Sequence, residues 1–169
     1  SAGVATEAEV RAHGRSVLFL SHSHSDHYCK EVLELPFAQV VVSQDFPARV
    51  RGLRAREGER LEACGMTVRV FGSTDMGVSF LVDVGDRRVF HAGDLNLWHW
   101  ENESTKEEIE EATAWFERIL RELAPYAGTV DAAFFPLDPR MGENTGAGAC
   151  RFNEVMRPKV LIPMHFQGD

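Results

Sequence analysis

Short apolar runs alternate along the chain with segments of helical spacing. The runs are either continuously apolar, which is typical of strands buried on both faces, or alternate with period 2. One segment contains Gly85-Asp86, which predicts two strands joined by a hairpin turn. The strand-like segments are 16–20, 38–43, 66–72, 77–94, 129–137 and 159–165.

Four segments have the apolar spacing of helices: 26–35, 45–53, 104–126 and 149–158. In the longest of them, Ser104 and Glu107 fit a capping box, and apolar residues recur every three or four positions. That stripe consists of Ile109, Thr113, Phe116, Leu120 and Leu123. Because short strands alternate with helices, we expect an α/β or α+β fold built from packed layers.

The bulk composition indicates a single globular domain over residues 1–169. Apolar residues make up 44% of the 169 residues and charged residues 26%, which is enough to bury a real core. The net charge of −8 argues against a broad basic face that binds nucleic acid. A bound metal can still supply a local positive centre.

The cysteines and the lack of long apolar runs bear on the compartment. Three widely spaced cysteines without a CxxC pair indicate reduced thiols, and we expect Cys29 to be a core thiol of the helix at 26–35. No apolar run approaches the length of a membrane span, and residues 1–15 have no signal-peptide core. The sequence therefore predicts a soluble cytoplasmic protein with no membrane partner.

Metal-binding residue types gather in "SHSHSDHYC", residues 21–29. His22 and His24 are two positions apart, so in extended backbone both rings can reach one ion. Asp26 and His27 are adjacent, so they can serve a second ion beside the first. Imidazole and carboxylate are the usual ligands of zinc, iron and manganese, and the histidine-rich balance favours zinc.

Two later strands end in residues of the same kind. "VFHAGD" ends in Gly93-Asp94, where glycine lets the backbone approach closely, and "VLIPMH" ends in His165. His91, inside the first of these strands, is expected to be a packed strand residue. Since open α/β layers build sites at the carboxyl ends of strands, we predict one metal site. Its residues are His22, His24, Asp26, His27, Asp94 and His165.

These motifs resemble those of the metallo-β-lactamase superfamily. "HSHSDH" matches its HxHxDH motif, and "HAGD" and "IPMH" match its later Asp and His motifs in the right order, over residues 16–165. "FHAGDLN" in a small domain is most similar to the ascorbate-6-phosphate-lactonase-like branch of uncharacterised metal-dependent hydrolases. The resemblance implies an αββα sandwich with a two-metal hydrolytic centre at one edge.

The resemblance also implies how the ligands divide. One ion would take His22, His24 and a further histidine, the other would take Asp26, His27 and His165, and Asp94 would bridge the two. The further histidine is missing, because Ser73 stands in its place and no histidine lies between His27 and His91. Water would fill the gap, since a serine hydroxyl is a poor zinc ligand.

His99 is the alternative replacement, although "LWHW" at 97–100 is typical of a hydrophobic lid or packing edge. We therefore expect one tightly bound zinc ion and leave room for a second, weaker one, with iron and manganese as alternatives. About twenty residues precede the first motif and four follow His165. Relative to the family, the sandwich would thus lack some opening strands and closing elements, which indicates a fragment or one part of a longer chain.

The leading functional hypothesis is a metal-dependent hydrolase that uses a metal-activated water on a small-molecule substrate. The substrate classes that stay open are lactone, ester, thioester, amide and phosphodiester. Asp26 is expected to orient that water and to carry its proton to the leaving group.

Two alternatives share the fold: a non-catalytic metal- or ligand-binding descendant, which the missing histidine motivates, and a nuclease, which the acidic charge disfavours. A flavodiiron-type redox protein is weaker, because the sequence has no flavin-binding segment. The oligomeric state stays open.

Overall fold

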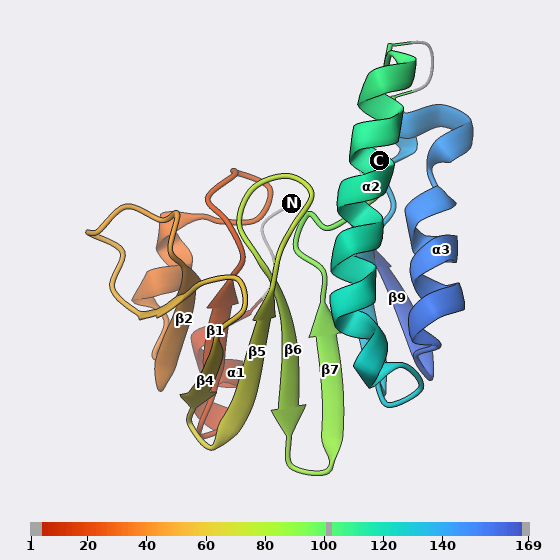
Figure 1. Cartoon of the computed structure of the whole chain (residues 1–169). Coiled ribbons are helices and arrows are strands. Elements are labelled where there is room, and N and C mark those ends of the chain that lie inside the picture. The colour runs from red at the N-terminus through yellow and green to blue at the C-terminus, as the bar shows by residue number, and fades with distance from the viewer. Residues whose placement is uncertain (1–4, 101–102, 167–169) are drawn as a thin grey trace.

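Two β-sheets face each other at the centre of the fold (Figure 1). The computed structural model describes residues 5–100 and 103–166. The smaller sheet is parallel, in the order β1 (Val17–Leu20), β2 (Gln39–Ser43), β3 (Leu53–Ala55). The larger sheet runs β4 (Arg60–Ala63), β5 (Met66–Phe71), β6 (Ser79–Val84), β7 (Arg87–His91), β8 (Ala132–Pro136), β9 (Val160–Met164).

The pairing of strands in the larger sheet changes from antiparallel to parallel at β7. Strands β4 to β7 are antiparallel neighbours, and β5, β6 and β7 follow one another directly along the chain. From β7 to β9 the pairing is parallel, because helices connect these strands. The carboxyl ends of β7, β8 and β9 therefore lie at one edge of the sheet, and the residues that follow them can meet there.

Apolar side chains fill the space between the two sheets. Val41 and Ala55 of the small sheet are fully buried against Val68 and Phe80 of the large one. The ring of Phe19 lies 5.3 Å from the ring of Phe80, which joins β1 to β6. This contact holds the end of β1 close to the large sheet.

Two helices cover the outer face of the large sheet, α2 (Lys106–Leu123) and α3 (Ala147–Met156) (Figure 1). The ring of Phe152 on α3 packs on Phe90 at 5.1 Å and on Phe135 at 4.7 Å. Short elements accompany them: α1 (Glu7–Ala12), η1 (Lys30–Glu34), η2 (Ala124–Tyr126) and η3 (Pro139–Asn144). Together with an outer layer of η1 and loop residues on the small sheet, this confirms the layered αββα architecture.

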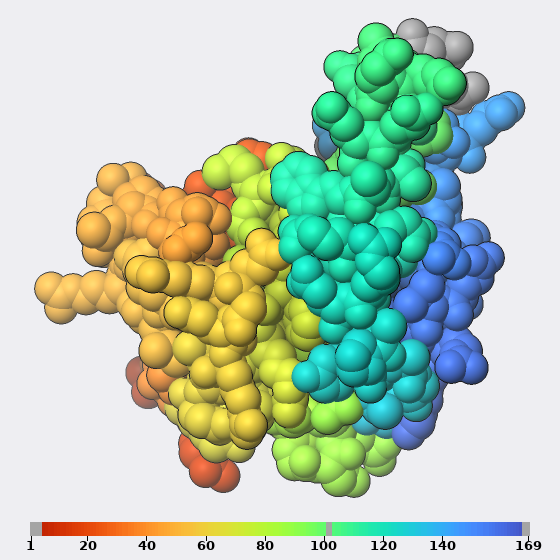
Figure 2. Space-filling model, viewed as in Figure 1, coloured from red at the N-terminus to blue at the C-terminus, as the bar shows by residue number. Residues whose placement is uncertain are grey.

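The stripe predicted on the long helix is largely correct. Phe116, Leu120 and Leu123 are buried, and Ile119 joins them. Ile109 is only half-buried, because the amino-terminal end of α2 projects past the body of the molecule (Figure 2). The capping box is one residue later than predicted, since the Thr105 hydroxyl accepts from the backbone N–H of Glu108 and the Glu108 carboxylate accepts from the Thr105 N–H.

The predicted helix at 45–53 is wrong. This segment forms turns and then enters β3, which the sequence reading missed. The Arg54 guanidinium donates to the carbonyl oxygens of Phe46 at 2.7 Å, Pro47 at 3.0 Å and Val50 at 2.7 Å. A side chain thus satisfies carbonyls that a helix would satisfy through its own backbone. The elements α1 and β4 were also missed.

The predicted helix at 26–35 is reduced to the short η1. The backbone N–H groups of His27 and Tyr28 both donate to the carbonyl of His24, at 3.0 and 2.9 Å, so one tight turn carries the motif. Cys29 is then extended, with φ −125°. Because no helix buries it, Cys29 is exposed, and its prediction as a core thiol is wrong.

The other predicted elements are found with shifted ends: 16–20, 38–43 and 66–72 contain β1, β2 and β5, and 77–94 contains β6 and β7. Likewise, 129–137 contains β8, 159–165 contains β9, and 149–158 overlaps α3. Within residues 5–100 and 103–166, no helix combines the length and the apolar character needed to cross a membrane.

Gly77 should tolerate a side chain poorly. Its φ is +78°, and an added Cβ would lie 2.0 Å from the carbonyl oxygen of Ser21. Gly58 has a similar φ of +82° but nothing within 4 Å of such a Cβ. We expect Gly58→Ala to cost about 1–2 kcal/mol of unfolding free energy and Gly77→Ala at least ~2 kcal/mol more, as measured by urea unfolding. Equal losses in the two variants would contradict the close approach.

Candidate metal centre

Four chain segments bring ligand-type side chains to one end of the fold. His22 follows β1, Asp94 follows β7 and His165 follows β9, each just past the carboxyl end of a strand. The β5–β6 loop, residues 72–78, arches over the same end in Figure 1. The location agrees with the general placement of sites in open α/β sheets.

The Asp94 carboxylate lies at the middle of the cluster and is only 3% exposed. Its Oδ2 is 3.1 Å from Nε2 of His22 and 3.9 Å from Nδ1 of His24. Its Oδ1 is 2.9 Å from Nε2 of His27 and 3.7 Å from Nε2 of His165. Each oxygen therefore faces one pair of histidines, which is the arrangement of a carboxylate that can bridge two ions.

Asp26 closes the cluster on the side of His27 and His165. Its Oδ2 lies 3.2 Å from Nε2 of His165 and 3.8 Å from Nε2 of His27. Its side chain is 53% exposed, so it also faces solvent. The structure thus brings together all six residues that the sequence singled out.

The donors fit a divalent cation. Nε2 of His22 and Oδ1 of Asp94 are buried and make no well-aligned hydrogen bond with a described residue, although they lie 3.1 Å from Oδ2 of Asp94 and 2.9 Å from Nε2 of His27, respectively. Such atoms are costly unless something compensates them, and an ion between imidazole and carboxylate does so. Three groups have all their donor atoms within 4.8 Å of one another: His22, His27, Asp94; Asp26, His27, His165; and His24, Asp75, Asp94.

Further polar groups contact the Nδ1 atoms of His22 and His165, whose Nε2 atoms face the carboxylates of the cluster. The Ser21 hydroxyl lies 3.1 Å from Nδ1 of His22 and leaves Nε2 to face Asp94. Oδ2 of Asp138, a fully buried residue, lies 3.3 Å from Nδ1 of His165 as an ion-pair contact, although this nitrogen makes no well-aligned hydrogen bond with a described residue. Partners of this kind fix the orientation of a ligand ring.

Asp138 is in turn held by Arg140. The Arg140 Nε donates to both carboxylate oxygens, at 2.9 and 3.0 Å, and this hydrogen bonding lowers the pKa of Asp138. The carboxylate is therefore ionised beside His165. The sequence reading missed Asp138, although its position just after the strand at 129–137 was a usable signal.

Ser73 stands at the place of the missing histidine, and His99 is the alternative replacement. Ser73 is buried, and its hydroxyl accepts from the backbone N–H of Asp75 at 3.4 Å. His99 falls in none of the groups of His, Cys, Asp and Glu donors found in the described part of the chain. Asp75, two residues after Ser73, belongs to the group with His24 and Asp94. The sequence analysis did not single out this residue.

A hollow of about 520 Å³ opens beside the cluster. Its lining residues are His24, Asp26, Thr74, Asp75, Trp98, Trp100, Arg140 and His165. The rings of Trp98 and Trp100 stack at 5.9 Å, and the Trp98 indole N–H donates to the backbone carbonyl of Asp94 at 2.8 Å. The "LWHW" stretch is therefore one wall of the hollow, packed against the metal-binding segment.

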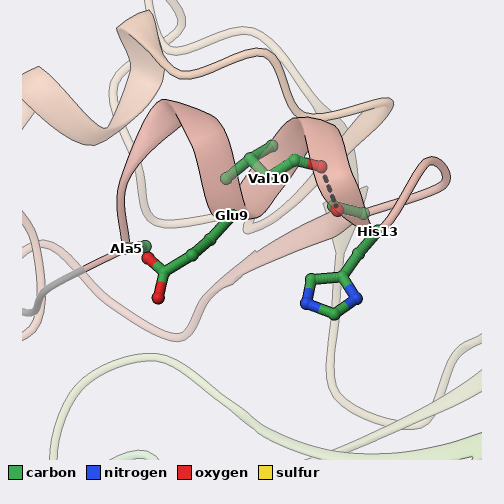
Figure 3. A pocket seen from close by; sticks show the side chains of 5 residues that line it. Ala5, Glu9, Val10 and His13 are labelled. Carbon is green, nitrogen blue, oxygen red and sulfur yellow. Dashed lines mark hydrogen bonds between the residues drawn. The ribbon is translucent and has the colours of Figure 1, made fainter.

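A second hollow lies beside α1, at the amino-terminal end of β1 (Figure 3). It is lined by Ala5, Glu9, Val10, His13 and Ser16. Glu9 is already engaged in the capping box of α1, and the Ser16 hydroxyl donates to the Val10 carbonyl at 3.0 Å. No three-donor group lies there among the described residues, so we assign no function to it.

Burial and ion pairing act in opposite directions on the central groups. Burial alone would lower the pKa of His27, but its hydrogen bond with Asp94 and its attraction to Asp94 and Asp26 outweigh burial and raise that pKa. Burial would raise the pKa of Asp94, but His22 and His27 lower it well below its ordinary range. Asp94 is thus a carboxylate over the whole physiological pH range.

His91 is a packed strand residue, as predicted. Its Nδ1 accepts from the backbone N–H of Gly93 at 3.0 Å, and its ring lies 6.1 Å from that of Phe134. Burial lowers the pKa of His91 to about 4. The ring is therefore neutral at physiological pH.

We expect His91 to make the metal-free protein acid-sensitive. The unfolded chain takes up the His91 proton near pH 6.5 and the folded chain only near pH 4, so stability falls as the pH drops through that window. The loss should reach about 3 kcal/mol, and His91→Gln should remove it. Urea unfolding of the wild type and of His91→Gln at several pH values measures the unfolding free energy. The difference between the two proteins at pH 8, where His91 is neutral in both states, gives the cost of the substitution in packing alone. If the unfolding free energies of the two proteins changed with pH in the same way, the role of His91 would be contradicted.

Asp138→Asn should weaken metal binding without unfolding the protein. The neutral amide cannot hold the His165 ring as a carboxylate does, so we expect about 10–100-fold lower affinity for one ion. Titration with a competing chelator measures the affinity. Asp86→Asn, whose native side chain is 89% exposed, is the matched control. Unchanged affinity in Asp138→Asn would remove any role for this contact in metal binding.

No protein-family model and no curated protein matches the chain, but solved structures do. A protein from Parabacteroides distasonis, provisionally described as a metal-dependent hydrolase, has a TM-score of 0.65 and 14% identity, over 90% of this chain and 66% of its own. The metallo-β-lactamase fold protein YhfI from Bacillus subtilis has a TM-score of 0.58 and 12% identity, over 94% and 69%. CmlA, a diiron β-hydroxylase from Streptomyces venezuelae, has a TM-score of 0.58 and 16% identity, over 89% and 35%.

The chain thus spans about two thirds of the first two proteins and about a third of CmlA. The finer resemblance to the ascorbate-6-phosphate-lactonase-like branch is not tested by these neighbours and stays a prediction. At such low identity the likeness concerns the fold, and it agrees with the two facing sheets and the site at their edge. The chain has the metallo-β-lactamase fold.

Proposed function

We propose that this domain is a metal-dependent hydrolase acting on a small-molecule substrate. The observation that carries the proposal is the position of Asp94, whose two oxygens face two separate pairs of histidines beside an open hollow. A structural metal site is normally closed by protein ligands, whereas a catalytic one keeps an open side. Here Asp26 and His24 lie at the exposed side of the cluster and also line the hollow.

The donors suit more than one ion. Histidine with carboxylate fits zinc, iron(II) and manganese(II), and zinc remains the first expectation. When bound, the ion would lower the pKa of a water molecule and polarise the scissile carbonyl or phosphoryl group. Proton transfer and substrate binding would depend on the side chains of this domain.

Asp26 is the group best placed to move a proton. Its carboxylate lies beside His165 and is half exposed, so it faces both the cluster and the hollow. It would hold the attacking water by hydrogen bonding and pass its proton to the leaving group. Asp94 is more buried and is held between histidines, which suits it to binding rather than to proton transfer.

The walls of the hollow suggest what the substrate carries. The Arg140 guanidinium carbon lies 5.5 Å from the centre of the Trp100 ring, so a cation and stacked indoles stand on one wall. This wall suits a substrate that has an apolar or planar part and an anionic group; a phosphodiester supplies the anion itself, and a lactone, ester or thioester would carry it elsewhere in the molecule. The size of the hollow favours a small molecule.

Hydrolysis should depend on bound metal and on the clustered residues. Protein loaded with zinc, manganese or iron(II) is assayed on a panel of lactones, esters, thioesters and phosphodiesters. We expect turnover on at least one class, lost on chelation, and lowered at least ~100-fold by His27→Ala or Asp94→Asn. His13→Ala, far from the cluster, is the histidine control and should retain activity.

Tight metal binding without turnover on any class would instead support a non-catalytic, metal-binding domain. Turnover that survives chelation and both substitutions would exclude the proposed centre as its source.

A further inference from the structure

The β5–β6 loop carries a carboxylate to the side of the centre where a histidine was expected. Asp75, His24 and Asp94 each offer a donor atom within 4.8 Å of the others. His24 in turn is one of the two histidines that face Oδ2 of Asp94. Among the described residues, Asp75 shares a donor group with His24 and Asp94, whereas His22 shares one with His27 and Asp94, so the carboxylate approaches the His24 side of Asp94.

Hydrogen bonds hold this loop against the Asp94 segment. The Thr74 hydroxyl donates to the backbone carbonyl of Asn96 and accepts from the Asn96 N–H, the latter at 2.9 Å. The residue before Asp75 is thus fixed to the residue two positions after Asp94. The place of Asp75 beside Asp94 is therefore built into the fold.

Glycines hold the loop against the His22 segment. At Gly77 a Cβ would lie 2.7 Å from Cβ of His22, and the backbone N–H of Val78 donates to the Ser21 carbonyl at 3.3 Å. At Gly93 a Cβ would lie 2.8 Å from the Val78 carbonyl oxygen. Only glycine can be accommodated at these close approaches. The segments that carry His22, Asp75 and Asp94 are therefore fixed side by side.

The buried atoms point to a cation and not to a solvated acidic surface. His22 is fully buried, its Nε2 makes no well-aligned hydrogen bond with a described residue, and it faces Asp94. Asp75 adds a further negative group at the exposed rim of this buried pair. A divalent ion would satisfy the orphaned ring nitrogen and relieve the repulsion between the two carboxylates.

We propose that Asp75 is a direct ligand, together with His24 and Asp94, of the ion on the His22/His24 side of the centre, in place of the histidine that Ser73 replaces. The inference rests on the metal centre of the proposed function. Each ion then has two histidines, one aspartate of its own and a share of Asp94. The two sites become alike in donor type, so both bind tightly, contrary to the unequal affinities expected from the sequence.

A third carboxylate also changes which ion is preferred. Oxygen donors suit manganese(II) and iron(II), whereas imidazole suits zinc well. The native centre is therefore more tolerant of the first two ions than its Asp75→His variant. A change in metal preference in Asp75→His is expected only if residue 75 binds the ion, and not if it only determines the shape of the loop.

The test counts the ions that remain after dialysis against a weak chelator. Asp75→Ala should retain one ion fewer than the wild type, with affinity for that ion lowered more than roughly 100-fold. Asp75→Asn, of nearly the same shape, should behave like Asp75→Ala, because an amide is a poor ligand. Asp75→His should restore the lost ion and shift the preference toward zinc. Met76→Ala, the neighbouring position in the same loop, is the control and should match the wild type.

Cobalt(II) spectra give a readout independent of activity. Visible absorption of the cobalt-loaded wild type should change in Asp75→Ala and Asp75→His but not in Met76→Ala. An Asp75→Ala protein that keeps every ion and an unchanged spectrum overturns the role of Asp75 and leaves the hydrolase proposal standing. A wild type that retains no ion overturns both, and loss of ions in Met76→Ala as well assigns the effect to the loop and overturns the ligand role.

Discussion

The Asp94 carboxylate is the interaction on which the arrangement of the site depends. It is almost completely buried, and four histidines from both ends of the chain surround it within 3.9 Å. A buried carboxylate is costly unless positive charge compensates it. Protonated histidine can supply that charge, as the raised pKa of His27 indicates, and a metal ion can supply it without a proton. The same geometry therefore favours cation binding and sets its location.

The layers of the fold bring these groups to Asp94. The parallel strands β7, β8 and β9 end at one edge, so the residues after them, Asp94, Asp138 and His165, are neighbours although they are far apart in the sequence. The contact between Phe19 and Phe80 brings the end of β1 to the same edge. Apolar packing thus places the ligands, and the polar groups behind them set their orientation.

The sequence was informative where a local pattern determines the structure. Continuous apolar runs predicted β1 and β2, and the ligand-type residues that follow three apolar runs predicted that the first motif would converge with Asp94 and His165. The predicted helix at 45–53 was wrong because Arg54, the residue just after this segment, binds carbonyls within it. Asp75 was missed because its value as a donor depends on Thr74 and Gly77 contacting distant segments, which no local pattern encodes.

His22 and His165 stand near opposite ends of the chain, on strands of different sheets, and both contact Asp94. Two ions that share Asp94 would together link His22 to His165 as a reversible cross-link that closes the segment between these residues into a loop. Closing so long a loop removes much of the conformational freedom of the unfolded chain. Global unfolding would then require release of an ion, and the lifetime of the native state would be set by how quickly metal exchanges rather than by packing alone.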